Sequence, residues 1–262
     1  MTSVFPKSRK ALIGVIHLKS LPGSPRWAGD LEAVLIAAVK DARAYESGGA
    51  TAVFIENFGD IPFTRGNVGP ETVAAMTAAG RAVREAIDIP IGFNVLRNDA
   101  CAALALCAAC GGAFIRVNVH TGAMITDQGL IEGDAYRTLR FRERISPSAL
   151  ILADVHVKHA IPLGPANLEV SARDTITRGL ADALIVSGTG TGAAAEFDDV
   201  RRVRVACPDS RILLGSGVTA HNAGEYREFA DGFIVGTSLK RNGDVAQPVD
   251  VRRVEALARK LR

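Results

Sequence analysis

Two carboxylates stand directly after apolar runs that have the composition of buried β-strands. Glu56 ends the segment VFIE, and Asp154 ends the segment LILAD. A carboxylate at the end of an apolar strand is partly desolvated, and desolvation raises its pKa toward the range in which a general base works at neutral pH. We therefore predict that Glu56 and Asp154 are catalytic acid–base groups. The alternative is a structural ion pair, for example with Arg116 or Lys158.

Further polar side chains follow the ends of other predicted strands. His156 and Lys158 come shortly after Asp154, and both are candidate catalytic residues. Lys158 could pair with Asp154 or with a substrate anion, whereas a Schiff-base role would need an apolar pocket that lowers its pKa. We expect a second set to bind and orient substrate oxygens. This set comprises His17, Asn94, Arg116 and Asn118.

A divalent metal ion is a further option for the same region. Carboxylate and imidazole ligands together suit Zn, Mn or Fe, and His17, Glu56, Asp154 and His156 supply both types. The sequence contains neither H-E-x-x-H nor H-x-x-E-H, so spacing alone does not indicate a metal site. The option depends on whether these four side chains converge in space.

Three Gly-rich loops late in the chain have the composition of phosphate-binding loops. Small residues let the backbone approach an anion closely, and Ser and Thr hydroxyls add donors. The alternative is that these glycines only permit tight turns at strand ends. The predicted phosphate-binding residues are Gly188, Gly190, Gly215, Ser216, Gly217, Gly236, Thr237 and Ser238, with Lys240 as an additional charge.

The elements that must position these residues repeat as short β-type runs followed by segments of helical period, which is typical of successive βαβ units. The predicted strands are 12–16, 52–55, 91–95, 113–117, 150–155, 183–186, 212–214 and 232–235. The predicted helices are one that begins after Asp30 and ends at Gly48, followed by 71–87, 99–109, 134–145, 168–178, 197–206, 222–229 and 251–261.

Eight such units predict an α/β fold, a (β/α)₈ TIM barrel that occupies residues 1–262 as one domain. The strand-to-helix connections of such a barrel share one face, where the loops after the last strands often bind phosphate. An open doubly wound sheet is the competing architecture, but no G-x-G-x-x-G turn follows the first strand. We therefore expect the polar residues and the loops after strands six, seven and eight to meet at one mouth.

Composition narrows the class of protein. The chain is 48% hydrophobic but 5% aromatic, which favours α/β layers rich in aliphatic residues. A net charge of +3 gives no indication of nucleic-acid binding. No segment has the length and apolarity of a membrane span, and the N-terminus lacks a signal core, so we expect a cytoplasmic protein. Cys107 and Cys110 are expected to be small buried helix residues.

Five segments together resemble the BtpA family, which includes SgcQ-like barrel proteins. They are GVIHLKSLPGSP at 14–25, ENFGD at 56–60, NVL at 94–96, RVN at 116–118 and ADVHVKH at 153–159. The resemblance covers nearly the whole chain and implies a barrel without an established reaction. It also implies the family's association with photosystem I biogenesis or stability. A triphosphatase label attached to some members is not supported here, because the chain has no G-x-x-x-x-G-K-[ST] loop.

Two functions from different classes follow as expectations. The first is an enzyme, of isomerase, lyase or hydrolase type, that acts on a phosphorylated sugar or nucleoside-like molecule by acid–base chemistry. The second is a non-catalytic assembly or stability factor, because a fold does not imply activity. The expected partner is a phosphorylated small molecule, and Phe58, Ile61 and Phe63 could form a homo-oligomer contact.

Overall fold

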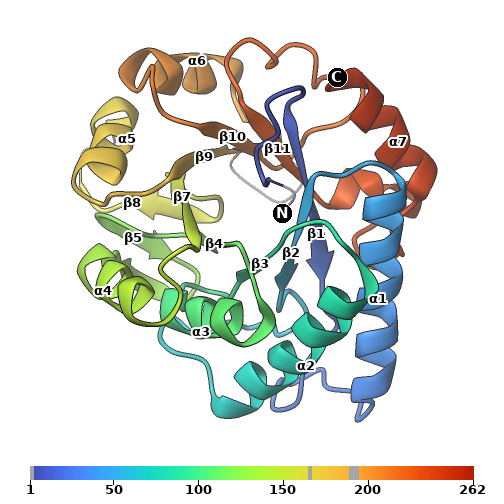
Figure 1. Ribbon diagram of the computed structural model, residues 1–262. Helices are drawn as coiled ribbons and strands as arrows, with labels where there is room; N and C mark the ends of the chain where they lie inside the picture. Colours follow the sequence, from blue (N-terminus) through green and yellow to red (C-terminus); the bar gives the residue numbers. More distant parts are fainter. Residues whose placement is uncertain (1–2, 165–166, 189–194) are drawn as a thin grey trace.

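The computed structural model describes residues 3–164, 167–188 and 195–262. Eight parallel strands form a closed barrel in the order β1-β2-β3-β4-β7-β9-β10-β11 (Figure 1). All eight predicted barrel strands are confirmed. They are β1 (Ala11–His17), β2 (Ala52–Glu56), β3 (Ile91–Asn94), β4 (Phe114–Val117), β7 (Leu150–Val155), β9 (Ala183–Ser187), β10 (Ile212–Gly215) and β11 (Gly232–Val235).

Seven α-helices are described, and Figure 1 shows them as a ring outside the strands. Asp30, Asp99, Asp134, Asn167 and Asp250 cap five of them, each accepting a hydrogen bond from a backbone N–H in the first turn. The helices are α1 (Leu31–Ser47), α2 (Pro70–Ala86), α3 (Ala100–Cys110), α4 (Ala135–Ile145), α5 (Leu168–Thr177), α6 (Phe197–Ala206) and α7 (Val251–Lys260).

The predicted helix at 222–229 is wrong. This segment, between β10 and β11, is a run of turns with scattered bonds, such as Arg227 N–H to the Gly224 carbonyl and Phe229 N–H to the Tyr226 carbonyl. Gly224 lies in its middle, and glycine disfavours a helix interior by about 1 kcal/mol relative to alanine. Ala223 and Tyr226, three residues apart, resemble the apolar face of a helix in the sequence, and both are buried although the segment is not helical.

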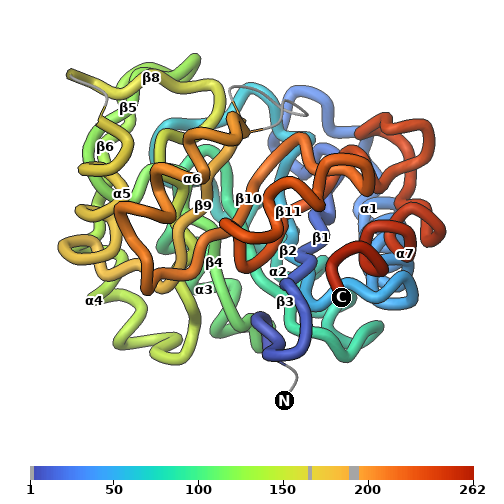
Figure 2. Tube along the Cα trace, turned by 90° about the horizontal axis from the view of Figure 1, so that it is seen from above, coloured from blue at the N-terminus to red at the C-terminus, as the bar shows by residue number. Residues whose placement is uncertain are grey.

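Two loops carry strands that the sequence analysis did not predict. The loop after β4 forms the hairpin β5 (Ala123–Thr126) and β6 (Gly129–Glu132), and the loop after β7 adds β8 (Ala160–Pro162). All pairs in this small sheet are antiparallel. Figure 2 shows it at the end of the molecule opposite the N-terminus. No helix in the described part of the chain is long and apolar enough to cross a membrane.

Alternation along the barrel strands sorts their side chains into an inner and an outer set. One buried cluster unites apolar residues from β1, β2, β4, β7, β9, β10 and β11, for example Ile13, Val15 and Phe54. A second, larger cluster joins the residues between them to the surrounding helices. Because alternate residues face the same side of a strand, the next inward position of each strand lies one layer above the apolar core.

Candidate active site

The uppermost inward layer of the barrel is polar, in contrast to the apolar layers beneath it. In seven of the strands this layer lies two residues beyond the last inward apolar residue, and in β3 it lies two residues beyond Gly92, which pairs with the inward Phe54. The eight residues of this layer are His17, Glu56, Asn94, Arg116, Asp154, Ser187, Gly215 and Gly236. Strand register sets Glu56 beside both His17 and Asn94. The candidate site is thus a rung of the barrel. Five of its members were predicted as catalytic or substrate-binding residues, and Gly215 and Gly236 were predicted to bind phosphate.

Glu56 is a buried carboxylate without a hydrogen-bond donor among the described residues. Its nearest ionisable neighbour is His17, whose Nε2 lies 3.9 Å from Glu56 Oε1, beyond hydrogen-bond distance. Burial raises the pKa of Glu56, and the nearby positive charges of Arg116 and Lys158 offset only part of that increase. A desolvated carboxylate with a raised pKa is suited to take up and release a proton near neutral pH.

His17 is held as a neutral imidazole. Burial, together with the positive charges of Lys240, Lys158 and Arg116, lowers its pKa well below 6.5. The ring packs edge-on against Phe58 at 4.7 Å between centroids, and His17 Nδ1 is buried without a hydrogen-bond partner among the described residues. A Cβ on Gly236 would lie 2.5 Å from His17 Cε1. The absence of a side chain at Gly236 therefore makes room for the His17 ring.

Asp154 forms a bidentate ion pair with Arg116. Arg116 Nε and Nη2 donate to the two carboxylate oxygens at 2.8 and 2.9 Å, and both side chains are almost wholly buried. Asn118 Nδ2 and the Ser187 hydroxyl donate to the same carboxylate at 3.3 and 2.8 Å. Four donors thus occupy Asp154, as in the structural ion pair considered as an alternative. A carboxylate so fully bonded orients its partners.

The side-chain amides of Asn94 and Asn118 extend this hydrogen-bond network across the barrel. Asn94 Nδ2 donates to Asn118 Oδ1 at 3.1 Å and to the Arg116 carbonyl at 3.2 Å. Asn118 in turn bonds Asp154. Asn94 Oδ1 is buried and has no partner among the described residues. Asp154 thus orients the Arg116 guanidinium, and the amides of Asn94 and Asn118 connect β3 and the end of β4 to the same carboxylate.

Lys158 and Arg97 add two cations to the mouth. Arg97 Nη2 donates to the Lys158 carbonyl at 2.6 Å, which ties the loops after β3 and β7 together. Burial lowers the pKa of the Lys158 ammonium, and the charge of Arg116 lowers it further. With Arg116 included, three cations lie at the mouth beside the carboxyl groups of Glu56, Asp154 and Asp127. Burial raises the pKa of Glu56 and so disfavours its negative charge, and the balance of charge at the mouth therefore favours an anionic ligand.

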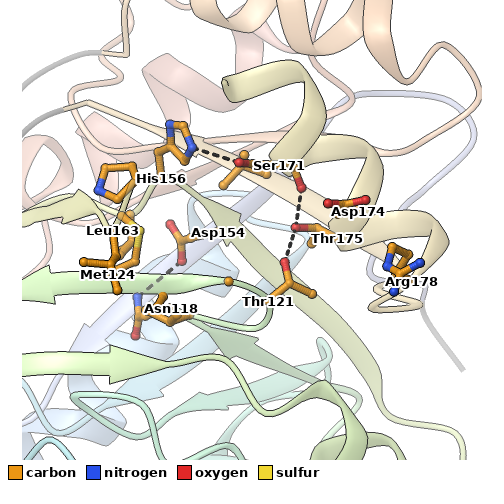
Figure 3. Close-up of a pocket in the computed structure, with 16 residues that line it drawn as sticks. Asn118, Thr121, Met124, Asp154, His156, Leu163, Ser171, Asp174, Thr175 and Arg178 are labelled. Carbon is orange, nitrogen blue, oxygen red and sulfur yellow. Dashed lines mark hydrogen bonds between the residues drawn. The ribbon is translucent and has the colours of Figure 1, made fainter. Parts of the chain in front are cut away.

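His156 is directed away from the polar rung. It has a left-handed backbone conformation, with φ 53°, and its Nε2 is hydrogen-bonded to the Ser171 hydroxyl of α5 at 3.0 Å. Figure 3 shows it in a separate cavity, of about 260 Å³, that Asp154 and Asn118 border from below. Among the described residues no three His, Cys, Asp or Glu side chains are grouped to hold a metal ion. His17, Glu56, Asp154 and His156 therefore do not converge.

Two cavities meet over the rung and share Glu56, Arg116 and Lys158. One, of about 360 Å³, is bordered by the loops after β10 and β11. The other, of about 520 Å³, lies under the loop after β2. Phe58, Ile61 and Phe63, expected on a contact surface, line this second cavity. A molecule that occupies both cavities would place its middle beside Glu56.

The first cavity has donors suited to an anion. The backbone N–H groups of Gly217, Thr237 and Ser238 make no hydrogen bond to a described residue. Ser216 and Gly217 have φ of 80° and 65°, left-handed values that turn the chain sharply after β10. Arg253 of α7 also borders the cavity and donates to the Ser238 carbonyl at 3.2 Å.

Other predicted phosphate-binding groups have different surroundings. The Ser238 hydroxyl donates to the Val218 carbonyl, and Lys240 Nζ donates to Asp41 of α1 at 2.8 Å, so neither group is free. Gly215 makes room within the rung, because a Cβ there would lie 3.1 Å from Ser187 Oγ. Gly188 is buried after β9, and Gly190 lies outside the described residues.

The family of the chain follows from comparison with known sequences. The BtpA family model matches residues 8–262. The chain belongs to the BtpA family. It is 45% identical to the photosystem I biogenesis protein BtpA of Synechocystis over 95% of this chain and 87% of that protein. It is 33% identical to the sgc region protein SgcQ of Escherichia coli, over 97% and 95% of the two chains. The family resemblance seen in the sequence is thus confirmed.

Solved structures confirm the barrel. A tryptophan synthase from Mycobacterium tuberculosis superposes with a TM-score of 0.62 at 20% identity, covering 97% of this chain and 93% of that one. The phosphoribosyl anthranilate isomerase of Thermus thermophilus gives a TM-score of 0.58 at 15% identity, over 95% and 97% of the chains. At these identities the likeness establishes the fold alone.

Three contributors to the mouth were missed in the sequence. Ser187 is two residues after the inward Ile185, so the period of the strand marks it. Arg97 follows β3 by three residues and Arg253 belongs to α7, where a basic residue usually faces solvent. No local pattern separates either arginine from a surface residue.

Proposed function

We propose that this BtpA-family barrel is an enzyme that acts on a phosphorylated small molecule by proton transfer. The observation that carries the proposal is Glu56: a buried carboxyl with a raised pKa, at the junction of two cavities, with no hydrogen-bond donor among the described residues. A structural carboxylate of this burial would normally be paired, as Asp154 is. Glu56 is therefore assigned as the general acid–base.

The surrounding residues take supporting roles in this proposal. As a carboxylate, Glu56 removes a proton from a substrate carbon or hydroxyl and later returns it. Lys158 donates to the substrate oxygen that gains negative charge. Asp154 is a positioning residue that holds Arg116 toward the substrate through the bidentate pair. Such chemistry suits an isomerase or lyase, and also a hydrolase.

The phosphate group is assigned to the first cavity. The N–H groups of Gly217, Thr237 and Ser238 bond no described residue, and with the guanidinium of Arg253 they match the needs of a phosphoryl group. The loops after the last two strands often have this role in (β/α)₈ barrels. One of the solved barrels of similar fold is a phosphoribosyl anthranilate isomerase, whose name specifies a phosphoribosyl substrate.

An assembly role is the second candidate, because the Synechocystis relative is named for photosystem I biogenesis. A scaffold does not require a desolvated carboxylate and three cations at its mouth. Such groups lower the stability of the fold, and selection keeps them where function needs them. The polar rung is the observation that favours the enzyme.

The proposal is tested with a screen of phosphorylated metabolites for turnover by the wild-type chain. Loss of a general base lowers the rate by roughly 10²–10⁴-fold, so Glu56→Gln is expected to lose turnover to this extent. Glu132→Gln, an exposed carboxylate on β6, is the matched control and should retain full activity. The acid limb of kcat/KM should lie above pH 4.5, because the pKa of Glu56 is raised. Full activity of Glu56→Gln would refute the assignment.

A further inference from the structure

The second cavity differs in chemistry from the phosphate-side cavity. Its wall includes Phe58, Ile61, Phe63 and Leu96, all from the loops after β2 and β3. Its volume, about 520 Å³, falls within the range typical of small-molecule sites. An inorganic phosphate or a bare phosphosugar would leave this apolar wall facing water. We therefore expect an apolar portion of the ligand to occupy this cavity.

A buried donor without a partner borders the same cavity. Arg97 is 4% exposed, and its Nε makes no hydrogen bond to a described residue, although its Nη2 bonds the Lys158 carbonyl. Buried polar groups in proteins nearly always have a partner. Arg97 lines the cavity, so a ligand acceptor, such as a ring nitrogen or an exocyclic oxygen, would lie against its guanidinium. The apolar wall lies opposite polar groups, among them Arg97, Asp127 and Lys158. This combination suits a planar heteroaromatic ring, which has apolar faces and an edge with hydrogen-bonding atoms.

We propose that the ligand is a nucleoside monophosphate or a closely related phosphorylated ring compound, with its heteroaromatic ring between Phe58, Phe63 and Arg97. The inference rests on the proposed function, because the phosphate end is assigned to the loops at Gly217 and Thr237. The pentose, between the two ends, lies beside Glu56 and Lys158. The reacting bond is accordingly on the sugar or at its junction with the ring.

The test is isothermal titration of the full chain with two kinds of probe. Ribose 5-phosphate reports on the phosphate and sugar sites, and the four common ribonucleoside 5′-monophosphates add a ring. Stacking on one aromatic side chain contributes about tenfold or more to affinity, so at least one nucleotide is expected to bind roughly tenfold more tightly than ribose 5-phosphate. Phe63→Ala should remove that advantage and leave ribose 5-phosphate binding unchanged.

Two further variants serve as controls. Phe63 is only half-buried, so Phe63→Ala should remain folded, and Phe63→Leu should restore part of the nucleotide affinity. Tyr136→Ala removes an aromatic ring that is 69% exposed on α4 and should change nothing. If ribose 5-phosphate binds and no nucleotide binds better, the ring site is refuted while the phosphate site stands. If ribose 5-phosphate and the nucleotides all fail to bind, the proposed function fails as well.

Discussion

Replacing Asp154 by asparagine removes the anionic partner of a buried guanidinium. Arg116 is 5% exposed and directs two N–H groups at the Asp154 carboxylate. An asparagine can accept a hydrogen bond through one oxygen only, and it carries no charge to offset that of Arg116. The variant therefore retains the shape of the side chain but strands a buried cation.

The expected loss follows from the burial of this pair. Breaking a buried ion pair by removing one partner costs about 3–5 kcal/mol. For a chain of this length that corresponds to a decrease in melting temperature of about 6–20 °C. Glu56→Gln removes a carboxylate that has no hydrogen-bond donor among the described residues, and burial disfavours its charged form. At pH 7 that variant should be as stable as the wild type, or slightly more stable.

Differential scanning calorimetry and urea unfolding at pH 7 compare the two variants directly. Ser187→Ala provides an intermediate case, because it deletes one neutral donor to Asp154, worth about 1 kcal/mol. The predicted order of stability is Glu56→Gln, then Ser187→Ala, then Asp154→Asn. Equal melting temperatures for Asp154→Asn and the wild type would contradict a structural ion pair. A large loss in Glu56→Gln would contradict its assignment as an unpaired group.

Two more predictions concern His17. Because the pKa of His17 is lowered in the folded protein, the unfolded chain binds a proton at this residue more tightly than the folded protein does. The free energy of unfolding should therefore fall as the pH drops below 6.5. His17→Gln should remove part of that decrease, measured by urea unfolding at pH 7 and pH 5. Gly236→Ala places a Cβ 2.5 Å from His17 Cε1 and should lower the free energy of unfolding by about 1–3 kcal/mol. Gly224→Ala, which meets no atom within 4 Å, is the matched control for the second variant; equal losses in the two would refute the packing argument.

The barrel strands were predictable because each is a short aliphatic run between turn signals, and burial on both faces requires such composition. His17, Glu56, Arg116 and Asp154 stood out together because each is a polar residue at the end of an apolar strand, and the period of two within each strand sets them on the same inward rung. The small sheet of β5, β6 and β8 was missed, since its strands are three or four residues long and follow barrel strands directly.

What the sequence left open was the pairing within the rung. Asp154 and Glu56 both end apolar strands, and only their neighbours distinguish them: four donors bond the Asp154 carboxylate, and no described residue donates to Glu56. The same limit applies to His156, whose left-handed backbone directs the ring toward α5. Side-chain direction at a strand end depends on contacts between distant loops, and local sequence patterns do not encode them.

A crystal structure of the chain with ribose 5-phosphate tests the proposed site most directly. The phosphoryl group is predicted between the loops at Ser216–Gly217 and Thr237–Ser238, within hydrogen-bond distance of Arg253, with the sugar directed toward Glu56. Arg253→Met should weaken binding, whereas Arg252→Met, at the neighbouring arginine of α7 that does not line the cavity, should not. Density for the phosphoryl group only in the cavity beside His156, or only on the outer surface, would contradict the assignment of the barrel mouth as a phosphate-anchored active site.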